Sequence, residues 1–141
     1  MEQCVHLEFE VAGNNFAQAG SASDQVKSTL KKLGIDPQDI RRVAIAMYEG
    51  EINMVIHANG GRAYVDIFVD KICIKLIDQG KGIENIELAM TPGYSTAPDD
   101  VRALGFGAGM GLPNMKKYTD VFNIESEVGK GTKVEMEIHF R

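Results

Sequence analysis

The alternation of apolar and polar residues predicts five strands. Residues 5–11 alternate in this way, which is typical of a strand with one buried face. Two pairs of strand-like runs follow, 63–69 with 72–77 and 121–127 with 132–140. Only a short polar turn separates the members of each pair, so each pair is expected to form an antiparallel hairpin.

Two helices are predicted between the first strand and the first hairpin. Residues 16–33 carry apolar side chains at helical offsets, although a glycine and two serines weaken the first half of this helix. The run 40–58 is stronger, because Asp36 and Pro37 before it are a typical N-cap and first helical residue. Consecutive glycines then end the helix.

A long polar loop interrupts the second half of the chain. Short helices are expected at 83–90 and 112–118, and the loop 91–111 between them is rich in Gly, Pro, Ser and Asp. Loops of this length are usually functional lids or disordered segments. The order of elements predicts a single domain over residues 1–141. We expect an α/β two-layer sandwich (α+β) with a mixed, mainly antiparallel sheet and helices on one face.

Composition narrows the classes of partner. The 141 residues include 15 Lys+Arg and 20 Asp+Glu, a net charge of −5, and 44% are hydrophobic, which suits a globular core. This acidic balance gives no electrostatic reason to bind nucleic acid or an anionic membrane. No run approaches the roughly 20 apolar residues that span a bilayer, and no signal peptide is visible, so we expect a cytoplasmic location. Cys4 and Cys73 lie inside strand-like runs and are expected in the core.

Glu49, Asn53 and His57 lie at four-residue steps on the helix 40–58 and so share one face of it. Asn53 could offer its carboxamide oxygen to Mg²⁺, and Glu49 could accept a proton from an attacking hydroxyl group or water. A solvent-facing side of the helix would produce the same stripe, and helix geometry alone does not decide between the two. Glu51 lies on another face and is expected to be a solvated surface charge.

Two glycine-containing segments are candidates for ligand loops. Asp78 ends an apolar strand, and Gly80 and Gly82 after it would let the backbone approach a ligand, although an ordinary turn would have the same composition. Residues 105–111 place glycine at every second position before a helix, an arrangement suited to a phosphate group. A flexible linker is the alternative for this second segment.

Neither of the two common glycine-rich nucleotide motifs is present. The segment 105–111 does not fit the Gly-x-Gly-x-x-Gly spacing in any register, and no strand precedes it, which rejects a dinucleotide-binding fold. A P-loop requires Gly-Lys followed by Ser or Thr, and neither Gly80-Lys81 nor Gly129-Lys130 is followed by either residue.

The order of the motifs resembles the Bergerat-fold (GHKL) ATPases over essentially the whole chain. Glu-x-x-x-Asn on a helix comes first, then Asp-x-Gly-x-Gly after a strand, then the glycine-rich segment before a helix, and finally Gly131-Thr132 at the start of the last strand. Within this superfamily, residues 93–96, 107–113 and 126–132 are similar to the anti-sigma-factor serine/threonine kinases (RsbT/RsbW-like). They are most similar to the RsbT-type switch kinases.

The resemblance implies ATP and Mg²⁺ as cofactors and a role for each motif residue. Glu49 would be the general base and Asn53 the Mg²⁺ ligand. Asp78 would accept a hydrogen bond from the adenine amino group. The remaining residues would surround the nucleotide: Gly80 and Gly82 at the adenine pocket, Gly107, Gly109 and Gly111 in a lid over the phosphates, and Thr132 as support for the adenine end.

The implied activity is that of an ATP-Mg-dependent protein serine/threonine kinase that phosphorylates a small regulatory protein, such as a STAS-domain anti-sigma-factor antagonist. The alternative is a nucleotide-gated anti-sigma factor that sequesters its partner, for example a sigma factor, with little turnover. Retention of both Glu49 and Asn53 favours the kinase, because sequestration needs no base. The ATPase part of a sensor histidine kinase is disfavoured, because no helix with a phospho-accepting histidine precedes the motifs. Homodimers are common in the resembling family.

Some positions depart from the family pattern or have no assigned role. Gly50 lies in mid-helix, at a cost of about 1 kcal/mol relative to Ala, which would be explained by close approach of backbone or ligand. Residues 97–104 lengthen the lid. Lys116 and Lys117 are expected to be surface lysines, and Arg102 in the lid is an open candidate for a phosphate contact.

Overall fold

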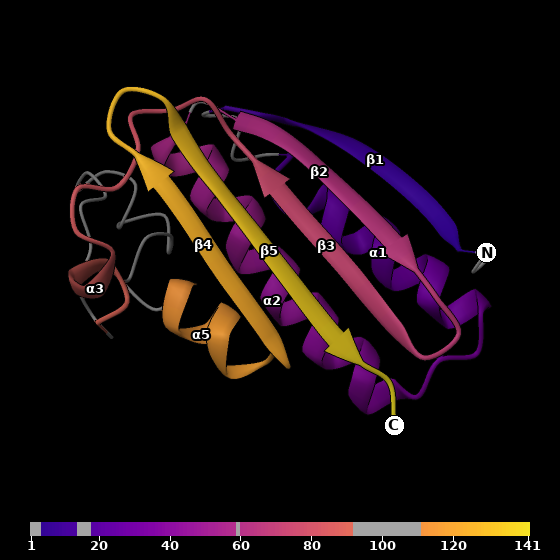
Figure 1. Cartoon of the computed structure of the whole chain (residues 1–141). Coiled ribbons are helices and arrows are strands. Elements are labelled where there is room, and N and C mark those ends of the chain that lie inside the picture. The colour runs from indigo at the N-terminus through magenta and orange to yellow at the C-terminus, as the bar shows by residue number, and fades with distance from the viewer. Residues whose placement is uncertain (1–3, 14–17, 59, 92–110) are drawn as a thin grey trace.

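The computed structural model describes residues 4–13, 18–58, 60–91 and 111–141. They form two layers, a sheet and a set of helices that cover one of its faces (Figure 1). The elements in chain order are β1 (Val5–Ala12), α1 (Ser21–Lys32), α2 (Pro37–His57), β2 (Gly60–Ile67), β3 (Lys71–Ile77), α3 (Ile86–Ala89), α5 (Gly111–Lys117), β4 (Val121–Glu127) and β5 (Gly131–His139).

The sheet has the strand order β1-β2-β3-β5-β4, and each of these pairings is antiparallel. Both predicted hairpins are present, β2 with β3 and β4 with β5. The hairpins meet where β3 pairs with β5, and Ile77 lies opposite Lys133 there. The residues just outside this pair, Asp78 and Thr132, are therefore brought together although 54 positions separate them.

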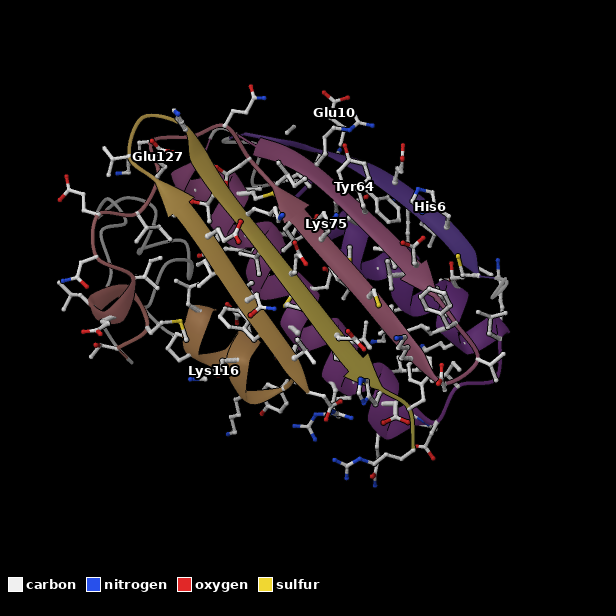
Figure 2. All side chains as sticks on the ribbon, viewed as in Figure 1. His6, Glu10, Tyr64, Lys75, Lys116 and Glu127 are labelled. Atoms are coloured by element: carbon white, nitrogen blue, oxygen red, sulfur yellow. The ribbon has the colours of Figure 1, made fainter. Side chains whose placement is uncertain are left out.

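The core lies between the sheet and the helices. Each central strand turns alternate side chains toward α2, as the period-two pattern predicts. The fully buried side chains of this layer include Val65, Ile72, Ile74 and Ile138 from the sheet and Leu30, Val43 and Met47 from the helices. The opposite face of the sheet carries polar groups, and Figure 2 shows His6, Glu10, Tyr64 and Lys75 there.

α2 crosses behind the sheet, with α1 and α5 on either side of it (Figure 1). The predicted start signal is confirmed, because the side chain of Asp36 accepts a hydrogen bond from the Gln38 N–H at 2.8 Å and Pro37 is the first helical residue. The N-terminus of α2 is therefore well defined, which fixes the positions of the residues along the helix.

Gly50 lets α2 pack directly against its neighbours. A Cβ atom at this position would overlap Cδ1 of Leu76 on β3 and would lie only 3.1 Å from Cε of Met115 on α5. The unfavourable helix propensity of glycine is thus offset by close packing with both the sheet and α5.

Glu51 is buried, so the prediction of a solvated surface charge was wrong. Its side chain is only 3% exposed and points to the start of α1. The carboxylate accepts hydrogen bonds from the backbone N–H groups of Gly20, Ala22 and Ser23 at 3.0 to 3.2 Å, and from the Ser23 hydroxyl at 2.8 Å. These donors are otherwise unpaired at a helix N-terminus, so α1 is capped by a residue of α2 rather than by its own sequence.

The cysteines were also predicted incorrectly as core residues. Cys4 is exposed before β1, and Cys73 is partly exposed on the polar face of β3 between two inward-facing isoleucines. Their positions follow from strand alternation, which residue type alone does not reveal. None of the helices in the described ranges is both long enough and apolar enough to cross a lipid bilayer.

Candidate functional site

The face of α2 that carries Glu49 and Asn53 lies against α5. Both side chains are partly buried. Asn53 donates Nδ2 to the thioether sulfur of Met115 at 3.9 Å, and a Cβ atom on Gly111 would lie 3.1 Å from Nδ2 and 3.2 Å from Oδ1 of Asn53. Asn53 therefore faces α5 rather than open solvent. The side chain of His57 lies outside the described part of the structure.

Asn53 keeps its carboxamide oxygen available as a ligand. The contact with Met115 uses the nitrogen, and the structure gives Oδ1 no hydrogen-bond partner among the described residues. In the same part of the chain no group of three or more His, Cys, Asp or Glu side chains could hold a metal ion. A carboxamide oxygen is a ligand type that Mg²⁺ accepts, usually together with water and substrate phosphate groups.

The carboxyl group of Glu49 is held in a partly desolvated setting. Burial raises its pKa above the ordinary value of 4.5, and a hydrogen bond from the side chain of Asn114 on α5 opposes this shift. A carboxylate with a raised pKa is a better proton acceptor than one in water. Partial burial thus makes the Glu49 carboxylate more basic than one in water.

Asp78 is fixed where β3 ends. Its Oδ1 accepts hydrogen bonds from the backbone N–H groups of Gly80 at 2.9 Å and Thr132 at 3.2 Å. The backbone N–H of Asp78 in turn donates to the carbonyl oxygen of Thr132 at 3.0 Å. Oδ2 has no hydrogen-bond partner among the described residues, so an oriented carboxylate oxygen remains for a ligand that carries a donor.

Gly80 and Gly82 fix the loop after Asp78 by approaching protein backbone. A Cβ atom on Gly80 would lie 2.7 Å from Cα of Ala58, just beyond the end of α2, and Gly82 adopts a positive φ of 80° beside the carbonyl oxygen of Glu127. The two glycines therefore allow the loop to pack closely between the end of α2 and the β4–β5 hairpin. The sequence had suggested a close approach to a ligand instead.

Ser126 joins the same loop to the final hairpin. Its hydroxyl oxygen accepts a hydrogen bond from the Ile83 N–H at 2.7 Å, lies 2.8 Å from the Thr132 hydroxyl and is 3.1 Å from the Gly131 carbonyl oxygen. Ser126 opens the segment 126–132, and no role was predicted for it from the sequence. Its inward position on an otherwise alternating strand was the available signal.

α2 sets the spacing of the whole site. With a rise of about 1.5 Å per residue, Asn53 lies roughly 6 Å along the helix from Glu49, and Ala58 roughly 13 Å from it. Ala58, just beyond the end of α2, packs on the loop of Asp78. The carboxylates of Glu49 and Asp78 are therefore held apart by the part of α2 that runs from Glu49 to its C-terminal end. This arrangement suits an elongated ligand with hydrogen-bond donors at one end and negative charge near Asn53.

The glycine-rich segment is only partly described. Gly111 opens α5, whereas Gly107, Gly109, residues 93–96 and Arg102 lie outside the described residues. On α5 itself, Lys116 is exposed at the surface (Figure 2), and Lys117 places Nζ 5.3 Å from the ring centre of Tyr118. The two lysines are therefore surface residues in this structure, as predicted.

Comparison with a family model gives the class of the protein. Residues 14–138 match the family described as "Histidine kinase-like ATPase domain". The solved structure of a mycobacterial sensor histidine kinase, MprB, superposes with a TM-score of 0.53 at 16% identity, covering 97% of this chain and 99% of that one. This structural likeness shows the fold, and the predicted α+β Bergerat architecture is confirmed.

Curated relatives then give the branch within this class. An anti-sigma F factor of Clostridium acetobutylicum is 37% identical over 99% of this chain and 96% of its own length. One from Clostridium beijerinckii is 36% identical over 92% of this chain and 90% of its own length. The chain thus belongs to the histidine kinase-like ATPase family, in the branch of the anti-sigma F factors. The narrower likeness to the switch kinases stays a prediction.

Proposed function

We propose that the protein is an ATP-Mg-dependent protein serine/threonine kinase that also acts as an anti-sigma factor. The observation that carries the kinase proposal is the pairing of Glu49 with Asn53 beneath α5, where burial raises the pKa of the Glu49 carboxyl group. Phosphoryl transfer to a hydroxyl group needs a proton acceptor and a metal ligand at fixed positions, and it needs no covalent intermediate. Glu49 would accept the proton from the acceptor hydroxyl.

ATP and Mg²⁺ fit the residues that surround this pair. The Oδ2 atom of Asp78 could accept the adenine amino group, since Oδ1 is already held by two backbone donors. Thr132 would support the adenine end through its N–H contact with Asp78, and Gly80 and Gly82 would shape the pocket wall. Asn53 would hold Mg²⁺ through Oδ1. When bound, the ion would spread the negative charge of the terminal phosphate group.

The glycines before α5 complete the proposed nucleotide site. Gly107, Gly109 and Gly111 would close over the phosphates, and the first two rest on sequence alone. For Gly111, the missing side chain leaves room beside the Asn53 carboxamide, where a cation would lie. Bulk at this position would press on the proposed metal ligand.

The proposed partners follow from the relatives. Proteins named anti-sigma F factor act on a sigma factor, and we extend this partner to the present chain. The phosphorylated protein would be a STAS-domain anti-sigma-factor antagonist, and the kinase would act as a homodimer in the cytoplasm, where sigma factors work. The alternative is a sequestering module in which ATP sets conformation and turnover is slight. The relatives' name favours binding of a sigma factor in either case.

Transfer of labelled phosphate tests the proposal. The purified chain is incubated with γ-labelled ATP, Mg²⁺ and the STAS-domain proteins encoded in the same genome. We expect label on one of them, loss of transfer in Glu49→Gln, and retained ATP binding in that variant. Glu84→Gln, an exposed glutamate near α3, is the matched control. Full transfer by Glu49→Gln would contradict the role of Glu49. Sigma-factor binding without transfer in the wild type would favour the sequestering module.

A further inference from the structure

One face of α5 lies against α2 and carries three residues of interest. Gly111, Asn114 and Met115 are spaced by three and four residues and so share one face of the helix. Gly111 lies beside the Asn53 carboxamide, and Met115 contacts both Asn53 and the backbone at Gly50. Asn114 lies on the same side of α5, and its side chain is a hydrogen-bond partner of Glu49. No motif in the sequence includes Asn114 as a site residue.

Among the described groups near Glu49, Asn114 is the polar partner that stabilises the carboxylate. Burial disfavours the charged form of Glu49, and no cation among the described residues offsets that cost. Of the other ionisable groups, Tyr48 is the neighbour on α2, and the pKa of its phenol is raised by burial and then by the charge of Glu49. On α5, Lys116 is exposed and lies two positions beyond Asn114, on another side of the helix.

We propose that Asn114 is a positioning residue for phosphoryl transfer: its carboxamide holds the Glu49 carboxylate in place, so that Glu49 can accept the proton of the acceptor hydroxyl. This inference rests on the proposed kinase function, because it assigns Asn114 a task through the general base. Asn114 itself would contact neither ATP nor the acceptor. Its loss should therefore leave nucleotide affinity unchanged while it alters the ionisation of Glu49.

The direct test is the titration of Glu49 in the nucleotide-free full-length chain, followed by ¹³C NMR of the side-chain carboxyl carbons and assigned with Glu49→Gln. A hydrogen bond from Asn114 favours the charged form of Glu49, so its loss should raise the pKa of that carboxyl group. In Asn114→Ala we expect the pKa of Glu49 to rise by about one unit. In Asn114→Gln, which keeps a carboxamide donor, we expect a smaller rise. Asn123→Ala, on the exposed face of β4, is the matched control.

The pH dependence of phosphoryl transfer gives the second readout. Activity should fall as pH decreases through the pKa of Glu49, so this acidic limb should move to higher pH by about one unit in Asn114→Ala. ATP affinity, measured by calorimetry, should stay within about twofold. The Gln variant should restore part of the activity, which a merely structural defect would not explain.

The possible results separate this proposal from the kinase proposal. An unchanged Glu49 pKa in both Asn114 variants, with circular dichroism showing that they fold, would overturn the positioning role. A shifted pKa with wild-type transfer at every pH would overturn it as well. A shifted pKa in a protein that transfers phosphate to no partner would support the contact with Glu49 but would contradict the kinase function on which the role depends.

Discussion

Asn53 and Met115 join the proposed metal ligand to the helix that follows the glycine-rich segment, with Nδ2 of Asn53 lying 3.9 Å from Sδ of Met115. The contact occupies the nitrogen of the carboxamide and leaves its oxygen available. It also ties the position of Asn53 to α5, whose first residue, Gly111, lies against the same carboxamide. The part of the proposed site around Asn53 is therefore built from two helices, and neither helix forms it alone.

The first prediction concerns Mg²⁺. Asn53→Ala should remove the Mg²⁺-dependent part of ATP affinity, because the oxygen proposed to bind the cation is lost. Calorimetric titration with ATP, with and without Mg²⁺, should show a metal effect in the wild type and almost none in the variant. Removal of metal with a chelator should bring the wild type to the affinity of Asn53→Ala. A full metal effect in the variant would show that Asn53 is not the ligand.

The second prediction concerns the buried cap of α1. Glu51→Gln should lower the free energy of unfolding by about 2 kcal/mol, because an amide nitrogen would face backbone donors that the carboxylate now satisfies. Urea denaturation measures the change. Glu87→Gln, an exposed glutamate on α3, should be nearly neutral. Equal stability of the two variants would mean that α1 does not depend on Glu51.

The third prediction tests the packing at Gly50. Gly50→Ala should destabilise the fold by about 1 to 3 kcal/mol despite the better helix propensity of alanine, because its Cβ atom would overlap Leu76. Leu76→Val removes the overlapping δ-carbon, so the double variant should recover part of that loss relative to Leu76→Val alone. A double-mutant cycle in urea measures the coupling. Purely additive effects would exclude the steric explanation.

The fourth prediction concerns acid stability. A hydrogen bond from the His139 N–H and then the Arg42 guanidinium, 2.8 Å away, lower the pKa of Asp120 below its ordinary value of 3.8. A carboxyl group with a lowered pKa stabilises the fold above its ordinary pKa, and this contribution is lost as pH falls through the folded-state value. Asp120→Asn should therefore cost about 1 kcal/mol at pH 7, and the gap should close in strong acid.

Urea midpoints between neutral pH and about pH 2 measure that gap. Glu125→Gln, on the exposed face of β4, is the control for charge removal. A difference between wild type and Asp120→Asn that stays constant across this range would contradict the ionic explanation.

The sequence predicted most of the fold because each long element carries a local signal. Asp36 and Pro37 mark the start of α2, and alternation marks every strand, so the order of elements and both hairpins are confirmed. The failures occur where a distant residue decides. Glu51 looked like a surface charge because its partners at the start of α1 are about 30 positions away.

The candidate site could be predicted only in part for the same reason. Glu49, Asn53 and Asp78 stand out through spacing and strand position. The structure places the first two on α2 and Asp78 at the end of β3, in a loop that packs on Ala58 just beyond α2. Asn114 gave no signal, because its importance depends on how α5 packs against α2. The roles of all these residues remain proposals, whereas the ATPase family itself is established by residues 14–138.

The most direct test of the account is ATP binding with Mg²⁺ by titration calorimetry on the wild type, Asp78→Asn and Glu49→Gln. Asp78→Asn keeps an acceptor oxygen for Gly80 and Thr132 but can place a donor where the adenine amino group would bind. We predict that wild type and Glu49→Gln bind with similar affinity, and that Asp78→Asn loses at least about tenfold, or about 1.4 kcal/mol. Equal binding by all three proteins, or no binding by the wild type, would contradict the proposed nucleotide site.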